Sequence, residues 1–434
     1  MNHFFVTNKK CGLTNISKVP EDNYQYYALA FLFAYRTFTL FLNIDKGQNI
    51  CFLLELFLLV FTYNTDPLFR RVCKYKLNVV WLLLVLYHWI NHGLQGVPHE
   101  YSYWAVLISP FQCYFLLIWT CFLAKKNFQK TLEAMLWGYL IFITLGAWDA
   151  WDLTGNASMY FYSEERLSGS IHTTQLGATA GLVFFILALL KHKRHMSSLR
   201  ILVYSILPIM IILAAGSRNG LIIMICGLAS LYMSSYLRKL SIRNILILII
   251  FSVILCIAVS QLLEMTYVGE RLMDTKEQAM NAMLIYGRTG TFIDYLGDRA
   301  WYYIVGFSNF MENPFWGIGY YNFRYYNNTE WIVHPEYILQ LAEGGIVATV
   351  LFVYFMSQCL YFLFKIIIEK RTNISFTLLM FFITILIVCM SATITHDIQY
   401  WPLIGISMTT IMDIDRNGRL MRPLLKKITK HPQY

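Results

Sequence analysis

The sequence predicts an all-α polytopic membrane protein with about 12 transmembrane helices, both termini in the cytoplasm and one large extracytoplasmic loop. Two observations lead to this fold class. Of the 434 residues, 57% are hydrophobic and only 14% are charged. Apolar runs of about 17–25 residues recur along most of the chain, and each is long enough to cross a hydrocarbon core about 30 Å thick. A single run would indicate one membrane anchor, whereas this recurrence excludes an ordinary soluble protein.

The apolar runs define the expected elements, with boundaries uncertain by about 2–4 residues. Helices are expected at 25–43, 48–64, 78–92, 103–124, 131–149, 172–190, 201–216, 220–236, 244–263, 340–364, 374–392 and 400–412. The chain accordingly divides into helices 1–6 over 1–200, helices 7–9 over 201–263, a large periplasmic loop over 264–339, helices 10–12 over 340–412 and a basic cytoplasmic tail over 413–434.

The basic residues predict how these helices are oriented. If the first helix starts inside, 26 of the 35 lysines and arginines fall on the cytoplasmic side, eight fall outside and Arg36 lies within the first helix. This asymmetry follows the positive-inside rule and indicates twelve spans with both termini cytoplasmic. The net charge of +10 therefore reflects membrane topology rather than a nucleic-acid surface. We expect the lipid bilayer as a partner and no nucleic acid.

The nine cysteines indicate neither a disulfide framework nor a metal site. They lie in or beside apolar runs or in segments predicted to be cytoplasmic, and none lies in the loop 264–339. They also lack the paired spacing that is typical of zinc sites. We therefore expect membrane-buried free cysteines, no metal and no cofactor.

A single arginine interrupts the apolar stretch around AAGSRNGLIIM, residues 214–224. Arg218 is the only charged residue between Ile201 and Tyr236. At the bilayer centre a guanidinium would cost several kcal/mol, but the predicted topology places Ser217–Gly220 in a tight turn at the outer face. Gly216 and Gly220 would supply the backbone freedom of that turn. We therefore expect Arg218 at the outer rim of the helix bundle.

The predicted loop 264–339 is the only soluble-sized segment, and connections of this length usually carry function. It contains GRTGTF with Arg288, NPFWGIGYYNF at 313–323, and HPEYILQ at its end. Together with the SRNG turn, these motifs resemble the O-antigen polymerase and ligase family of bacterial membrane glycosyltransferases, over roughly residues 200–365. The family has an Arg-bearing turn, a Gly-Arg motif, an N-P-x-x-G-x-G segment and a closing histidine motif in this order. Pro335 is a departure, since the family often has asparagine after the histidine.

The resemblance implies transfer of sugar from undecaprenyl pyrophosphate to a hydroxyl acceptor at the outer face of the inner membrane, without a cofactor. Arg218 and Arg288 would then bind the pyrophosphate, because a guanidinium stays ionised and contacts phosphate oxygens in pairs. His334 would accept the acceptor's proton, since its ordinary pKa of about 6.5 lies near working pH. Glu336 would orient His334, act as the base itself, or cap the following helix. A flippase and a chain-length regulator of the same pathway are expected partners from the family.

Several further residues near these motifs are weaker candidates. Arg299 and Arg324 are further cations that could bind an anionic sugar or phosphate. Tyr337 and Gln340 lie about one turn into the following helix, and their default role is packing. The aromatic residues that could stack on sugars, although by default they pack against the membrane, are Trp301, Trp316 and Tyr320.

Charged and polar residues also occur inside the predicted N-terminal helices. Arg36 and Glu55 are intramembrane charges, which by default carry a function or pair with each other, and we predict that they form an ion pair. His88 and His92 are one helical turn apart near the outer face. Two histidines alone are a poor metal site, so we interpret them as polar residues at the membrane interface.

Three functions remain open: a polymerase that joins lipid-linked repeat units, a ligase that moves finished glycan onto lipid A–core, and a transporter or flippase for lipid-linked glycans. A transporter typically has ionisable residues or broken helices near the midplane in repeated halves, whereas here the candidate residues gather at the outer face. Other polyprenyl-dependent glycosyltransferases usually carry acids in the first outer loop, where this chain has only Asp45. The closing motif and the aromatic-rich loop favour the polymerase over the ligase, with inversion at the anomeric carbon.

Overall fold

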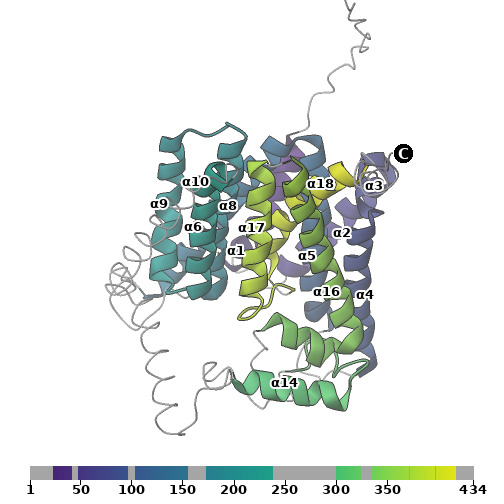
Figure 1. Ribbon diagram of the computed structural model, residues 1–434. Helices are drawn as coiled ribbons and strands as arrows, with labels where there is room; N and C mark the ends of the chain where they lie inside the picture. The colour runs from purple at the N-terminus through teal and green to yellow at the C-terminus, as the bar shows by residue number, and fades with distance from the viewer. Residues whose placement is uncertain are drawn as a thin grey trace, which may run out of the picture.

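The computed structural model describes residues 23–41, 47–95, 103–154, 173–237, 300–323, 335–370, 372–395 and 397–416. Within these ranges the chain is helical and contains no strand. The helices are α1 (Tyr24–Phe41), α2 (Gly47–Thr65), α3 (Pro67–Cys73), α4 (Lys76–Gln95), α5 (Tyr103–Lys126), α6 (Phe128–Thr154), α8 (Thr173–His192), α9 (Ser198–Ala214), α10 (Arg218–Leu237), α14 (Ala300–Glu312), α16 (Glu336–Lys370), α17 (Asn373–Val388), the short 3-10 helix η2 (Ile398–Tyr400) and α18 (Trp401–Arg416). Figure 1 shows these helices as a bundle, with α14 lying across one end of it.

Most of the predicted helices occur at the expected places. Eleven of the twelve are present, and the remaining one, at 244–263, lies outside the described residues. Five of the described helices are long and apolar enough to cross a membrane, or six if the bent pair α2–α3 counts as one span. The apolar helices α9, α10 and α17 are shorter. The structure thus supports a multi-pass all-α membrane protein, while the twelve spans and their orientation stay predictions.

Two described α-helices were not predicted from the sequence. Helix α3 begins at Pro67, after Asp66, whose carboxylate accepts a hydrogen bond from the Leu68 N–H at 2.8 Å. An acidic cap followed by proline is a strong local start signal, but seven residues are too few to register as an apolar run. The chain bends by 115° between α2 and α3. Helix α14 lies within the segment that we expected to be a loop.

At one end of the bundle, polar contacts join the loops and helix ends that lie there. Lys126, at the end of α5, pairs with Asp66 at 3.0 Å. The Tyr75 hydroxyl, just before α4, donates to Asp415 near the end of α18 at 3.2 Å. This end carries many of the basic residues that we assigned to the cytoplasm. The opposite end carries α14 and the start of α16 (Figure 1).

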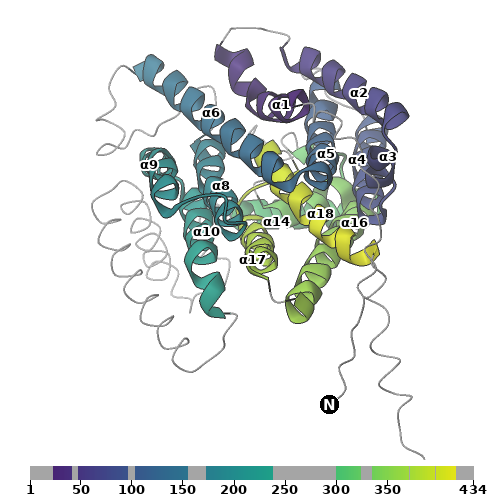
Figure 2. The same cartoon turned by 90° about the horizontal axis from the view of Figure 1, so that it is seen from above.

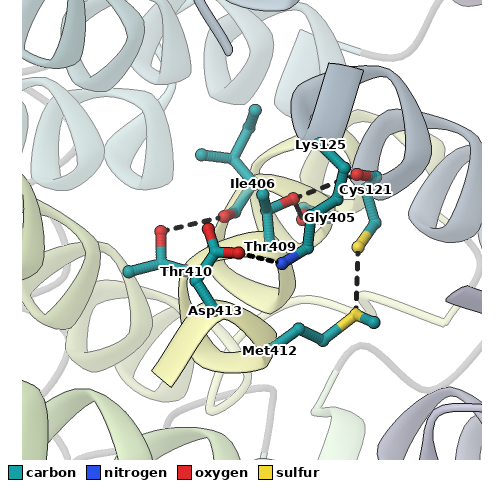
Figure 3. Close-up of polar contacts among 8 residues, drawn as sticks. All are labelled: Cys121, Lys125, Gly405, Ile406, Thr409, Thr410, Met412 and Asp413. Carbon is teal, nitrogen blue, oxygen red and sulfur yellow. Dashed lines mark hydrogen bonds and ion pairs between the residues drawn. The ribbon is translucent and has the colours of Figure 1, made fainter. Parts of the chain in front are cut away.

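Helices α5 and α18 cross closely in the interior (Figure 3). An added Cβ on Gly405 would lie 2.6 Å from the Leu117 carbonyl oxygen, so only glycine permits this separation of the two backbones. The Thr409 hydroxyl then reaches the Cys121 carbonyl oxygen on α5 at 3.2 Å. Small residues and hydroxyl groups of this kind are typical of helix pairs packed within membranes.

The exposed apolar surface lies on helices at the edge of the bundle. Seen from above, α2 and α9 lie at the periphery and α8 lies further inside (Figure 2). Phe57 on α2 and Leu202 on α9 are 62% and 63% exposed, whereas the side chains along α8 from Leu176 to Leu190 are buried. An apolar periphery around a buried centre is what lipid contact requires.

Candidate functional site

The α17–η2 connection, residues 389–397, is the point at which several helices meet. The Ser391 hydroxyl donates a hydrogen bond to Asn219 Oδ1, in the first turn of α10, at 2.8 Å. The Gln175 amide, at the start of α8, donates to the Asp397 carboxylate at 2.5 Å. The connection therefore ties the starts of α8 and α10 to the end of α17.

Arg218 is the first residue of α10. Helix α9 ends at Ala214, the turn that follows contains Gly216 with φ 57°, and Ser217 Oγ accepts a hydrogen bond from the Gly220 N–H at 3.1 Å. Ser217 thus caps α10, and the turn ends before Arg218 instead of containing it, which corrects the expected Ser217–Gly220 turn. The free N–H groups at a helix start favour anions, so α10 and the half-buried Arg218 present positive charge together.

Gly220 has another role than the one we expected. It lies within the first turn of α10, and an added Cβ would lie 2.5 Å from the carbonyl oxygen of Gly177 on α8. The glycine is needed for the close approach of the two helices, while Gly216 supplies the left-handed turn residue. This contact fixes the position of α10 along α8.

Glu336 is the first residue of α16, and its side chain is fully buried. Its Oε2 accepts hydrogen bonds from the backbone N–H groups of Ile394 and Thr395 at 2.6 and 3.2 Å. Its Oε1 accepts from the Thr395 hydroxyl at 2.9 Å and from the Gln340 amide at 2.7 Å. The Glu336 N–H in turn donates to the Cys389 carbonyl at 2.8 Å. Glu336 therefore caps the α17–η2 connection rather than its own helix.

The C-terminal end of α4 carries a buried polar face. The His88 ring nitrogen Nε2 lies 3.1 Å from Gln340 Oε1, and the His92 Nδ1 lies 2.7 Å from the Tyr320 carbonyl oxygen. The Asn91 amide donates to the Glu343 carbonyl at 2.9 Å. The two histidines are only 2% and 1% exposed, so our interpretation of them as interfacial residues is wrong. Both histidines are buried because residues 313–323 and α16 cover this end of α4.

The segment 313–323 is held against α16 by Glu343. The buried Glu343 carboxylate accepts hydrogen bonds from the N–H groups of Tyr321 and Phe323, at 2.8 and 3.1 Å. Gly317 has φ 69°, and an added Cβ would lie 2.4 Å from the Glu343 carbonyl oxygen. The sequence analysis missed Glu343; an acid placed seven residues after Glu336, two helical turns along the same face, was the available signal.

Residues 203–353 match a family model described as O-antigen ligase. This part of the chain is similar to the O-antigen ligases. The match covers about a third of the chain and takes in Arg218, the segment 313–323 and Glu336. It confirms the resemblance to the O-antigen polymerase and ligase family. A comparison with curated proteins finds no match.

The match supports a glycosyltransferase-like enzyme family, and the apolar helices of the described residues suggest a multi-pass membrane protein. The α17–η2 connection and the polar face of α4 both lie outside the matched residues 203–353. Their contacts with Asn219, Glu336 and Gln340 nevertheless attach them to the matched residues. The candidate site is therefore built from more of the chain than the matched domain.

The structure describes some of the predicted site residues and not others. Those outside the described residues are Arg288, Arg299, Arg324 and His334, together with the side chain of Trp301. Arg218 and Glu336 are described, and both lie in helix starts that contact the α17–η2 connection. The roles predicted for Arg288 and His334 stay predictions.

The remaining described candidates differ in exposure. The Tyr337 hydroxyl donates to the Leu386 carbonyl at 3.1 Å, which fits the packing role. Tyr320 is fully buried with its ring 4.3 Å from the His88 ring, so it offers no surface to a sugar. Burial, with the nearby Glu343, raises the pKa of the Tyr320 hydroxyl, which therefore stays neutral. Trp316 is 58% exposed and keeps the sugar-stacking role open.

Glu55 on α2 is fully buried, and its carboxylate oxygens have no hydrogen-bond partner among the described residues. A buried carboxylate without a partner is costly, which supports the predicted pair with Arg36. The side chain of Arg36 lies outside the described part of the structure, so this pair stays a prediction.

Proposed function

We propose that the chain is a surface-polysaccharide polymerase, a membrane glycosyltransferase that joins undecaprenyl-pyrophosphate-linked oligosaccharide repeat units at the outer face of the bacterial inner membrane. One observation carries this proposal. Asn219, next to Arg218 at the start of α10, and Glu336, in the first turn of α16, both form hydrogen bonds with the α17–η2 connection. This contact supports a site that includes the cation Arg218 and the start of α16, both within the residues that match the O-antigen ligase family.

The chemistry needs positive charge at the leaving group and a base at the acceptor. Arg218 and Arg288 contact the pyrophosphate, and the positive end of the α10 helix dipole adds to their attraction. His334 takes the proton of the acceptor hydroxyl. The hydroxyl oxygen bonds to the anomeric carbon while the bond to the pyrophosphate oxygen breaks on the opposite face, which inverts the configuration. The leaving group departs as undecaprenyl pyrophosphate, so no metal and no cofactor enter this scheme.

Glu336 belongs to the site, and its contacts support a holding role over that of a base. Both of its oxygens already accept hydrogen bonds, from Ile394, Thr395 and Gln340. A base needs a lone pair that faces the substrate, which this arrangement does not leave to Glu336. Arg299 and Arg324 remain as further cations for an anionic sugar or phosphate.

The second candidate is an O-antigen ligase that transfers undecaprenyl-linked glycan to lipid A–core, and the description of the matched family favours it. Both enzymes use the same donor and differ in the acceptor. A glycan flippase is the third candidate, but a site built at one end of the bundle gives it no support.

A glycolipid gel separates these candidates. A strain lacking the gene is compared with the same strain complemented by wild type and by His334→Ala. Lipid A–core carrying a single repeat in the deletion strain would support the polymerase, and bare core with long polymer on undecaprenyl pyrophosphate would support the ligase. Repeat units that accumulate on the cytoplasmic leaflet would instead refute both in favour of a flippase. Full rescue by His334→Ala would eliminate the histidine as the base.

A further inference from the structure

A chain of buried side chains runs from α4 through α16 to the α17–η2 connection. His88 Nε2 lies 3.1 Å from Gln340 Oε1, and Gln340 Nε2 lies 2.7 Å from Glu336 Oε1. Glu336 Oε2 in turn accepts hydrogen bonds from the backbone N–H groups of Ile394 and Thr395. His88 is 2% exposed, and Gln340 and Glu336 are fully buried. Three segments that are far apart in the sequence are thus joined by polar contacts that water does not reach.

The donor and the acceptor of each contact follow from the chemistry of the groups. The Glu336 oxygens accept from four donors, so the Gln340 amide nitrogen donates and its oxygen is left as an acceptor. His88 must then carry its proton on Nε2 to donate to Gln340. The His88 ring is held 4.3 Å from the Tyr320 ring, which limits its rotation. Every bond in the chain therefore has a defined direction.

We propose that His88 and Gln340 are positioning residues of the transfer reaction. Through Glu336 they hold the first turn of α16 against the α17–η2 connection, which also contacts α10 at Asn219, beside Arg218. This role rests on the proposed function for its effect on rate. The linkage itself is a property of the structure that is measured without any substrate.

General stabilisation alone does not explain this arrangement. A buried polar pair contributes little net stability, and apolar side chains of the same shape often serve equally well. What a directed network adds is one defined geometry. Errors of about 1 Å in the placement of reacting groups cost up to about 100-fold in rate. A network of this kind therefore matters most where it ends beside a group that is proposed to bind the substrate, such as Arg218.

The test compares four variants of the full-length protein purified in detergent. His88→Phe keeps a ring but removes the donor, and His88→Gln keeps an N–H donor. Gln340→Met removes the central link with little change in volume. The control is Asn78→Leu, which removes another buried amide of α4 whose side chain donates to the Val72 carbonyl at 2.8 Å, away from the site.

Two quantities are measured, namely the hydrogen exchange of the 389–397 amides and the values of kcat and KM for glycan transfer, per folded molecule. We expect His88→Phe and Gln340→Met to speed exchange at Ile394 and Thr395 and to lower kcat about 10- to 100-fold, with KM changed less than about twofold. His88→Gln should restore most of both. Asn78→Leu should lower the melting temperature but leave exchange and kcat as in wild type.

The proposal is overturned if His88→Phe and Gln340→Met behave like Asn78→Leu in both measurements. It is also overturned if exchange speeds up but kcat is unchanged in a wild-type enzyme that is active. Wild-type protein that transfers glycan to neither acceptor would instead refute the proposed function. The exchange data, which need no substrate, would then decide alone whether His88 and Gln340 hold the connection.

Discussion

The contact between α8 and α10 allows a sharp test of how Arg218 is placed, through the substitution Gly220→Ala. In the structure an added Cβ lies 2.5 Å from the Gly177 carbonyl oxygen and 2.7 Å from its carbonyl carbon. Both atoms belong to the backbone, so no side-chain rotation relieves the clash. Ordinary contact begins near 3.4 Å, and the two helices must therefore separate by about 0.9 Å.

The expected cost follows from that displacement. Overpacking of this kind costs about 1–3 kcal/mol, while replacing a helical glycine by alanine contributes about 1 kcal/mol in the opposite direction. We expect a net loss of up to about 2 kcal/mol in the free energy of unfolding. The rate should suffer more, because Arg218 lies two residues before Gly220 and a shift near 1 Å costs up to about 100-fold.

Two measurements on purified protein check this prediction: unfolding in a denaturing detergent and kcat for glycan transfer. The matched control is Gly138→Ala on α6, where the added Cβ lies 3.2 Å from Ala30 and a shift of a few tenths of an ångström suffices. The control should keep wild-type stability and kcat. If Gly220→Ala is indistinguishable from Gly138→Ala in both, the contact with α8 does not position Arg218 and the reasoning fails.

Three further substitutions test the site. Glu336→Gln replaces one of two accepting oxygens by a donor, so at least one buried N–H or hydroxyl loses its partner; we expect the free energy of unfolding to fall by about 1–3 kcal/mol, and an unchanged value would contradict the capping role. Gly345 interrupts the helical backbone inside α16, with φ 62°. Gly345→Ala adds a Cβ 2.4 Å from the Phe315 carbonyl oxygen, so we expect the free energy of unfolding to fall by about 1–3 kcal/mol; wild-type thermal unfolding would show that this kink is dispensable. Arg218→Lys keeps the charge but loses the planar pair of donors, so kcat should fall roughly tenfold or more at unchanged melting temperature. Full activity of that lysine variant would exclude paired contacts with the pyrophosphate.

Local patterns in the chain were sufficient for most of the elements. Apolar run length placed eleven helices, because crossing hydrocarbon requires a set number of apolar residues whatever the neighbours are. The motif order around Arg218, residues 313–323 and Glu336 was sufficient for the family. Short helices escaped this reasoning: α3 has only seven residues, and its start depends on Asp66 and Pro67 rather than on hydropathy.

Contacts between segments that are far apart in the sequence could not be predicted from it. Glu336 and Ile394 are 58 residues apart and His88 and Gln340 are 252 residues apart, and nothing in their spacing links them. The predicted roles changed accordingly. In the structure Glu336 caps the α17–η2 connection, and His88 and His92 are buried. Gly220 permits the close contact between α8 and α10.

The sequence by itself determined the class of protein, the places of its helices and the family, since each depends on residues that are near one another in the chain. Only the tertiary structure decided which helix ends meet at the α17–η2 connection and which polar groups satisfy one another there. The physical reason is that hydropathy specifies how deeply a side chain is buried but not what it is buried against. A buried carboxylate such as Glu336 must find hydrogen-bond donors, and only packing determines which donors those are.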